Sequence, residues 1–348
     1  MKHCNNLGKY ASKYFKTTIE ILKNANDIST LKFFCFENNI TVCGIKFIKE
    51  IIKKEIDISI LKEMEIFSLN DGDVVNEREP VLIINGKYQH FALLEGIIDG
   101  ILTRLSSIST NVKKIMEIDE NINFIYMADR NDLYLNQPYD GYAAYIGGAR
   151  NFVTEAMMKF IDSEDIMHVG TMPHSLIQLS KGDIINALKK FSKTYPENKV
   201  TALIDYSNDC LNEIKKIASS DFVNIVNFVR VDTSINLVDK CLQIGDWQND
   251  LSIKGACSKL IFKVRKTLDE CNLQNVKIIV TGSISKNKII QYKKENTPID
   301  VYGIGSWLLR KICHFTGDLI QINGISEAKI GRTCDIKQYL MKMNKWIL

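Results

Sequence analysis

The sequence predicts an α/β protein, with an amino-terminal α+β domain over residues 1–120 and an irregular (β/α) barrel over residues 121–309. Two patterns predict it. Before residue 120, helical periodicity alternates with strand and turn signals, which is typical of helices packed on a small antiparallel sheet. After residue 121, short β-branched runs recur between helical stretches, which indicates βαβ units and a parallel sheet. We expect the tail, residues 310–348, to pack back on the first domain.

The first domain begins with a helical pattern in which Phe15, Ile19 and Leu22 fall on one face. Further along, an Asn-Asp-Gly sequence centred on Asp71 separates two apolar stretches, which predicts a hairpin. The expected elements are, in chain order, a helix over 14–24, a helix over 44–52, a hairpin over 66–75, a strand over 81–88 and a long helix from 90 past 109.

Six apolar runs define the expected strands of the barrel: 124–128, 166–170, 200–204, 225–231, 276–280 and 299–303. Each run ends in polar residues or glycine: Asp129-Arg130, Thr171, Asp205, Asp232, Thr281-Gly282-Ser283 and Gly303-Ile304-Gly305-Ser306. Helix caps alone place such residues after strands. However, the carboxyl ends of parallel strands share one face, where active sites of such folds lie. We therefore expect these side chains to converge on a site.

The two last strand ends have the composition of phosphate-binding loops. Glycine lets a backbone approach an anion closely, and the N–H groups at the start of the next helix point at it. A plain turn is the alternative for either loop alone. The residues expected to bind phosphate are Gly282, Ser283, Gly303, Gly305 and Ser306.

Charged residues at two other strand ends suggest the rest of the chemistry. Asp205 and Asp232 are suited to the hydroxyls of a sugar or to Mg²⁺, and helix capping is the alternative. Arg230 lies two positions before Asp232, so both side chains face the same side of a strand. A guanidinium there requires a carboxylate or phosphate, and an ion pair with Asp232 is the competing interpretation.

Composition excludes several classes of protein. The 348 residues are 45% hydrophobic and 25% charged, and the net charge is 45 − 41 = +4, which excludes a disordered chain and a strongly basic nucleic-acid binder. No apolar run reaches the ~20 residues of a membrane helix, and the first residues lack the apolar core of a signal peptide. The nine cysteines are scattered without a Cys-x-x-Cys pair. A cytoplasmic protein with reduced thiols, no membrane contact and no nucleic-acid partner is expected.

Several segments together resemble the nicotinate phosphoribosyltransferases, a family with the type II phosphoribosyltransferase fold that is related to the quinolinate phosphoribosyltransferases. The matching segments begin at Tyr14-Phe15, Glu79-Pro80-Val81-Leu82, Leu105-Ser106, Ala144-Tyr145-Ile146-Gly147-Gly148, Gly170-Thr171-Met172-Pro173-His174, Arg230-Val231-Asp232 and Gly303-Ile304-Gly305-Ser306. The Gly-Thr-Met-x-His segment is the most specific of them. The resemblance implies a barrel of the type II phosphoribosyltransferase kind.

The resemblance also implies roles for individual residues. Tyr14 would stack on the pyridine ring, from the other subunit of a homodimer. Thr171 and Arg230 would hold nicotinate, and Arg130 would bind substrate or pyrophosphate. His174 resembles the histidine that the family phosphorylates with ATP. Asp205 and Asp232 would bind the ribose and Mg²⁺.

The implied reaction joins nicotinate to phosphoribosyl pyrophosphate in NAD salvage, and it suits these residue types. The pyridine nitrogen is the nucleophile and carries no proton at neutral pH, so positioning and charge stabilisation are sufficient. Glu95-Gly96-Ile97 stands where quinolinate enzymes carry Glu-Arg-Thr, which argues against a dicarboxylate substrate. The alternatives are a quinolinate or nicotinamide phosphoribosyltransferase, a barrel lyase or isomerase for sugar phosphates, and a non-catalytic sensor of phosphoribosyl ligands.

Overall fold

The computed structural model describes residues 7–170, 172–244 and 250–347. The chain divides into two compact units. Unit 1 comprises residues 1–113, 142–148 and 309–348, and unit 2 comprises residues 114–141 and 149–308. The helix α4 (Glu95–Met116) begins in unit 1, and α5 (Gln137–Gly147) begins in unit 2. Within the described residues, no helix is long and apolar enough to cross a membrane.

Unit 1 contains helices packed on an antiparallel sheet. Its helices besides α4 are α1 (Lys13–Leu22), α2 (Ile45–Glu55), α3 (Ile58–Leu61) and α12 (Lys337–Leu340). Its strands are β1 (Ser29–Phe34), β2 (Ile40–Thr41), β3 (Glu65–Ser68), β4 (Val74–Val75), β5 (Leu82–Gly86), β13 (Thr316–Ile322), β14 (Ile325–Ser326) and β15 (Asn344–Lys345). Six of them form one sheet in the order β14-β13-β1-β5-β3-β15.

Two faces of this sheet bury different apolar clusters. Leu31 and Phe33 of β1 point into the main core of the unit, together with Ile48 and Ile52 of α2. The opposite face carries a smaller cluster that includes Ile83 of β5 and is covered by the carboxyl-terminal segment. This alternation follows from the two-residue period of a strand.

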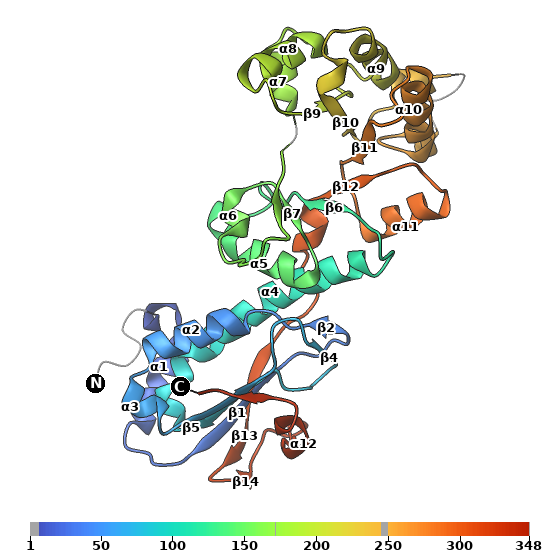
Figure 1. The fold of residues 1–348 in the computed structure, drawn as a ribbon. Coiled ribbons are helices and arrows are strands. Elements are labelled where there is room, and N and C mark those ends of the chain that lie inside the picture. Colours follow the sequence, from blue (N-terminus) through green and yellow to red (C-terminus); the bar gives the residue numbers. More distant parts are fainter. Residues whose placement is uncertain (1–6, 171, 245–249, 348) are drawn as a thin grey trace. The chain divides into compact units, whose positions relative to one another are not determined.

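The carboxyl-terminal segment supplies strands to the same sheet as the amino-terminal residues. β13 pairs antiparallel with β1, from Ser29 opposite Ile322 to Phe34 opposite Thr316, and Figure 1 shows these strands side by side. β15 pairs with β3.

The hairpin expected over residues 66–75 is wrong. β3 pairs with β5 and β15, whereas β4 pairs with β2 in a separate two-stranded sheet. The carboxylate of Asp71, in the turn itself, instead accepts the backbone N–H groups of Gly44 and Ile45 at 2.8 Å. The turn therefore caps the start of α2 and does not join two paired strands.

Unit 2 is built on seven parallel strands, in the order β8-β7-β6-β12-β11-β10-β9. The strands are β6 (Phe124–Tyr126), β7 (Asn151–Phe152), β8 (Met167–His168), β9 (Val200–Leu203), β10 (Val226–Val231), β11 (Lys277–Val280) and β12 (Val301–Ile304). Its other helices are α6 (Glu155–Met158), α7 (His174–Gln178), α8 (Ile184–Thr194), α9 (Cys210–Ala218), α10 (Ser258–Glu270) and α11 (Lys286–Lys294).

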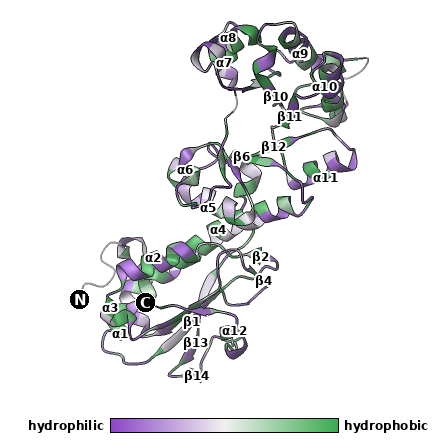
Figure 2. Ribbon diagram, viewed as in Figure 1, coloured by the Kyte–Doolittle hydropathy of each residue, from purple (hydrophilic) through white to green (hydrophobic). Residues whose placement is uncertain are grey.

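This sheet is an open, curled half-barrel, because β8 and β9, consecutive in the chain, are its two edges. The predicted fold class is confirmed. Each of the six predicted runs overlaps a strand, and β7 is an additional one. Figure 2 shows that α11 is mostly hydrophilic. Its buried residues are Ile289 and Tyr292.

Candidate functional site

The strand order of unit 2 brings most of the polar strand ends to one part of the sheet. β10, β11, β12 and β6 are consecutive neighbours in the sheet. Their carboxyl ends carry Asp232, Thr281, Gly305 and Arg130. Because the strands are parallel, these residues lie at one edge, as the sequence predicted.

A cavity of about 620 Å³ opens at this edge. Four of the predicted site residues line it: Arg130, His174, Arg230 and Asp232. Apolar side chains of Met127, Val153 and Val169 line it as well. The combination of two guanidinium groups with an apolar wall suits a flat, partly apolar anion.

Asp232 is held by partners on both of its carboxylate oxygens. Nη2 of Arg230 donates to Oδ2 at 2.8 Å, and Oγ1 of Thr281 donates to Oδ1 at 2.6 Å. The Arg230 and Asp232 side chains are only 12% and 15% exposed. The ion pair considered from the sequence is therefore present, and it fixes a guanidinium that also lines the cavity.

His174 and Asp205 form the second charged pair. The imidazole Nε2 lies 3.2 Å from Oδ1 and 3.3 Å from Oδ2 of Asp205. Burial raises the pKa of Asp205, the neighbouring His174 opposes that rise, and the charge of Asp232 adds to it. His174 begins α7 and its side chain is 45% exposed, whereas that of Asp205 is 5% exposed. The imidazole is thus accessible and oriented by a buried carboxyl.

The glycines at the last strand ends have close neighbours. Gly282 has φ +86°, and a Cβ there would lie 3.2 Å from Oδ1 of Asp232. A Cβ on Gly303 would lie 2.7 Å from Sδ of Met127, and one on Gly305 would lie 2.7 Å from Oδ1 of Asn131. The positive φ at Gly282, the close side chains at Gly303 and the backbone oxygen of Met127 at 2.7 Å from a Cβ on Gly305 thus favour glycine without any ligand. Their role in phosphate binding stays a prediction, as does that of Ser283 (φ +54°) and Ser306.

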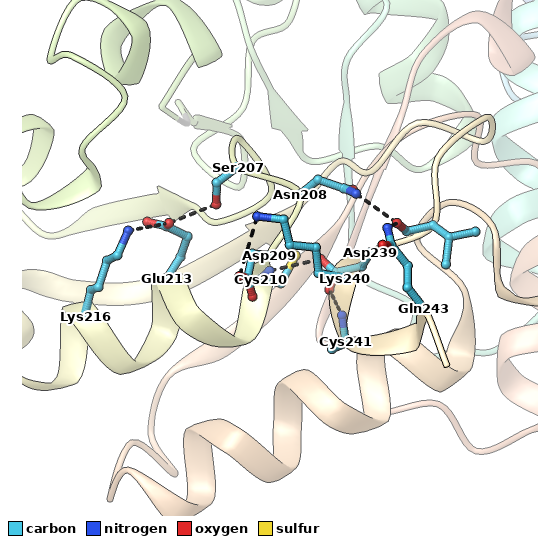
Figure 3. Close-up of polar contacts among 11 residues, drawn as sticks. Ser207, Asn208, Asp209, Cys210, Glu213, Lys216, Asp239, Lys240, Cys241 and Gln243 are labelled. Atoms are coloured by element: carbon cyan, nitrogen blue, oxygen red, sulfur yellow. Dashed lines mark hydrogen bonds and ion pairs between the residues drawn. The ribbon is translucent and has the colours of Figure 1, made fainter. Parts of the chain in front are cut away.

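A polar network fixes the loops after β9 and β10, which carry Asp205 and Asp232. Figure 3 shows the residues of this network. Asp239 is fully buried, and its carboxylate accepts the backbone N–H groups of Cys210 and Cys241 at 3.0 Å each. Nδ2 of Asn208 and Nε2 of Gln243 both donate to the carbonyl of Val238, at 2.8 and 2.7 Å. The loop after β9 is thereby tied to the loop after β10.

Sequence reasoning missed Asp239 and Thr281 as residues that build the site. Asp239 follows no expected strand end, and the interpretation of Thr281 concerned its glycine neighbours. A polar residue directly after an apolar run was the signal available for Thr281. No strand end marks Asp239: its contact with Cys241 is a local helix cap, and its contact with Cys210 is 29 residues away in the sequence.

Two of the predicted site residues, Tyr14 and Thr171, are not placed at the candidate site in unit 2. Tyr14 is on α1 in unit 1 and is 63% exposed. Thr171 lies outside the described residues. Both assignments stay predictions.

The carboxylates present determine how a metal ion could be held. The described part of the chain has no group of three or more His, Cys, Asp or Glu side chains placed to bind a metal ion. Asp205 and Asp232 supply two carboxylates, and the charge of Asp232 raises the pKa of Asp205. This set fits Mg²⁺, which proteins bind through one or two carboxylates plus the phosphates of a substrate.

Residues 14–106 match the family of the quinolinate phosphoribosyl transferase N-terminal domain. The nicotinate phosphoribosyltransferase of Bacillus subtilis (strain 168) is 24% identical over 247 residues, which are 70% of this chain. The chain spans 45% of the length of that curated relative. These matches confirm the resemblance seen in the sequence.

The solved structures decide the fold. The crystal structure of nicotinate-nucleotide pyrophosphorylase from Pyrococcus furiosus superposes with a TM-score of 0.76 over 93% of this chain and 78% of that one, at 24% identity. The chain has the type II phosphoribosyltransferase fold. Human nicotinic acid phosphoribosyltransferase shares this fold, with a TM-score of 0.66 at 13% identity over 92% of this chain and 76% of its own.

Proposed function

We propose that the protein is a nicotinate phosphoribosyltransferase. It forms nicotinate mononucleotide and pyrophosphate from nicotinate and phosphoribosyl pyrophosphate, in the salvage branch of NAD biosynthesis. The observation that supports this best is the Arg230 guanidinium, which is held by Asp232 at 2.8 Å and lines a cavity of about 620 Å³. A fixed guanidinium is a natural partner for one carboxylate.

The proposed reaction needs positioning rather than a strong base. Arg230 binds the nicotinate carboxylate and thereby directs the ring nitrogen at C1 of the ribose. The bond from nitrogen to C1 forms as the bond from C1 to the pyrophosphate oxygen breaks, and pyrophosphate leaves with the electron pair. Arg130 stabilises the negative charge of the leaving group. Asp205 and Asp232 would hold Mg²⁺ together with the phosphates, and the ion would neutralise part of their charge.

ATP coupling is proposed to proceed through His174. The Asp205 carboxylate at Nε2 favours the tautomer with its proton on that nitrogen, which leaves a lone pair on Nδ1. That lone pair attacks the γ-phosphorus of ATP, a nitrogen–phosphorus bond forms, and ADP leaves. Hydrolysis of the phosphohistidine accompanies nucleotide formation.

Replacing His174 tests this coupling separately from the transfer reaction. In His174→Ala we expect stimulation by ATP to be lost, while basal formation of nicotinate mononucleotide persists. The measurement is the initial rate with and without ATP, together with labelling of the protein by [γ-³²P]ATP. Unchanged ATP stimulation, or equal labelling of wild type and variant, would show that His174 does not carry the phosphoryl group.

Quinolinate is the second candidate substrate. The match of residues 14–106 to a quinolinate phosphoribosyl transferase domain favours it, and Arg130 places a second guanidinium in the cavity. Assays with nicotinate, quinolinate and nicotinamide at equal concentrations separate the alternatives. We expect turnover of nicotinate to exceed that of the other two at least tenfold.

We also propose a homodimer in which Tyr14 of one subunit stacks on the pyridine of the other. Its 63% exposure leaves the ring available for such a contact. Sedimentation of the purified protein, with the nicotinate KM of Tyr14→Ala, tests this arrangement.

A further inference from the structure

Unit 1 contains a small basic cavity that the proposed reaction does not use. It has a volume of about 230 Å³ and lies between β1 and the segment 331–339. Three cationic side chains line it: Lys32, Arg78 and Arg332. All of its lining residues belong to unit 1.

Lys32 is the most unusual of these residues, because a lysine in a strand is only 3% exposed. It alternates with Leu31 and Phe33, which point into the main core, so its side chain projects on the opposite face of the sheet. Within the described part of the chain, no carboxylate forms an ion pair with it. Its Nζ lies over the Phe34 ring, 4.4 Å from the ring centroid. Its partner on the neighbouring strand β13 is Asp318, whose carboxylate pairs with Arg332. Burial of an ammonium group that forms no ion pair of its own is costly.

Arg332 reaches the same cavity with an unused donor. Its Nε forms an ion pair with Oδ2 of Asp318 at 3.3 Å, and that buried oxygen has no hydrogen bond among the described residues. Its Nη1 is buried and has no hydrogen-bond acceptor among the described residues. The guanidinium lies 4.7 Å from the Phe36 ring centroid and 5.6 Å from that of Phe34, so the rings hold its plane in place.

Arg78 supplies the third positive charge. Its Nη1 donates to the carbonyl of Gly331 at 3.1 Å, which ties the guanidinium to the start of the segment that closes the cavity. Asp335 also lines the cavity, and its Oδ1 accepts the backbone N–H of Lys337 at 3.1 Å. Counting Asp318 and Asp335 against the three cations, 3 − 2 leaves a formal charge of +1 around the cavity.

We propose that this cavity binds a phosphate-class oxyanion, either inorganic phosphate or the phosphate group of a small metabolite. Such an ion gives Lys32 an ionic partner, since Asp318 opposite it pairs with Arg332, and it supplies the acceptor that Nη1 of Arg332 lacks. The volume is below the roughly 300 Å³ at which pockets for larger organic ligands begin. Bound there, the ion connects β1 to the segment 331–339 and stabilises unit 1. This inference is independent of the proposed function.

Titration calorimetry with inorganic phosphate at constant ionic strength tests the proposal. The full chain carries Arg130→Gln and Arg230→Gln, which weaken anion binding at the cavity in unit 2. We expect one phosphate per chain, and an affinity at least tenfold lower after Lys32→Met or Arg332→Gln. The exposed Lys329 lies in the same tail outside the cavity, so Lys329→Gln is the charge-matched control and should bind as the parent does.

Two results of these titrations would contradict a phosphate site in unit 1. Absence of phosphate binding, or an equal loss in Lys329→Gln and Lys32→Met, would overturn the proposal. If Arg332→Gln does not fold, Lys32→Met decides, because methionine keeps most of the apolar stem. A parallel titration with ribose 5-phosphate distinguishes the sources: tighter binding than phosphate identifies a phosphate ester, and weaker binding identifies the free ion.

Discussion

Asp232 connects three parts of the candidate site at the scale of single residues. It accepts from Arg230 on its own strand and from Thr281 on the neighbouring strand, and a Cβ on Gly282 would touch it. The sequence could predict that Arg230 and Asp232 face the same side, because a strand has a period of two. It could not predict Thr281 as a partner, because that contact depends on the pairing of β10 with β11.

Asp99 shows what burial does to a carboxyl that no motif marks. Burial, reinforced by the nearby charge of Glu95 and weakly by that of Asp318, raises the pKa of Asp99 to about 7. The backbone of Gly317 opposes the rise by hydrogen bonding. The Oδ1 atom of Asp99 is buried and has no hydrogen-bond partner among the described residues. The folded protein therefore favours the protonated carboxyl, whose O–H is a donor.

Asp99→Asn is predicted to change the pH dependence of stability. Because the folded pKa lies above the unfolded one, the folded state binds the extra proton between about pH 4 and pH 7, and the free energy of unfolding falls as pH rises through that window. Asparagine does not ionise, so its burial does not carry the cost of a buried carboxylate charge. We expect the variant to be more stable than wild type by roughly 1–3 kcal/mol at pH 8, with the gain disappearing towards pH 4. Urea unfolding at both values measures it, and a pH-independent difference would contradict the explanation.

At the scale of elements, the sequence predicted the long strands and helices better than the pairing of short ones. The β-branched runs that became β10 and β11 are apolar over at least four positions, which is a strong local signal. β7 was missed because two residues, Asn151 and Phe152, carry no periodicity. The hairpin over 66–75 was wrong because tertiary pairing with β5 and β2 overrode a local turn signal.

The loop network around Asp239 leads to a stability prediction. Both carboxylate oxygens accept backbone N–H groups in a fully buried position, so Asp239→Ala leaves two donors without acceptors. We expect a loss of roughly 2–4 kcal/mol in the free energy of unfolding. The exposed Asp221 is the control, and Asp221→Ala should stay within about 0.5 kcal/mol of wild type. Equal stability of the two variants in urea unfolding would show that the network does not fix these loops.

At the scale of the whole molecule, unit 1 depends on both ends of the chain. β13 pairs with all six residues of β1, and Cys313, Phe315 and Trp346 belong to the main core of the unit. The sequence suggested that the tail packs on the first domain, but not that it pairs with β1, because strand partners distant in sequence leave no local pattern.

Removal of residues 310–348 is predicted to unfold unit 1. The truncated chain would expose one edge of β1 along its full length, together with the apolar surface that Phe315 and Trp346 cover. We expect aggregation or the loss of one cooperative transition in calorimetry. Removal of residues 347–348 alone keeps Trp346 and should leave the melting profile unchanged. A truncated chain that melts like wild type would contradict the dependence on the tail.

The central proposal is that the protein transfers a phosphoribosyl group to nicotinate, which Arg230 binds in the cavity of unit 2. The most direct measurement follows nicotinate mononucleotide and pyrophosphate together, starting from nicotinate, phosphoribosyl pyrophosphate and Mg²⁺, in wild type and in Arg230→Gln. The account predicts the two products in a one-to-one ratio from wild type, and kcat/KM for nicotinate at least 100-fold lower in the variant, a change of about 2.7 kcal/mol. Absence of the nucleotide with wild type, or equal kcat/KM in the variant, would contradict it.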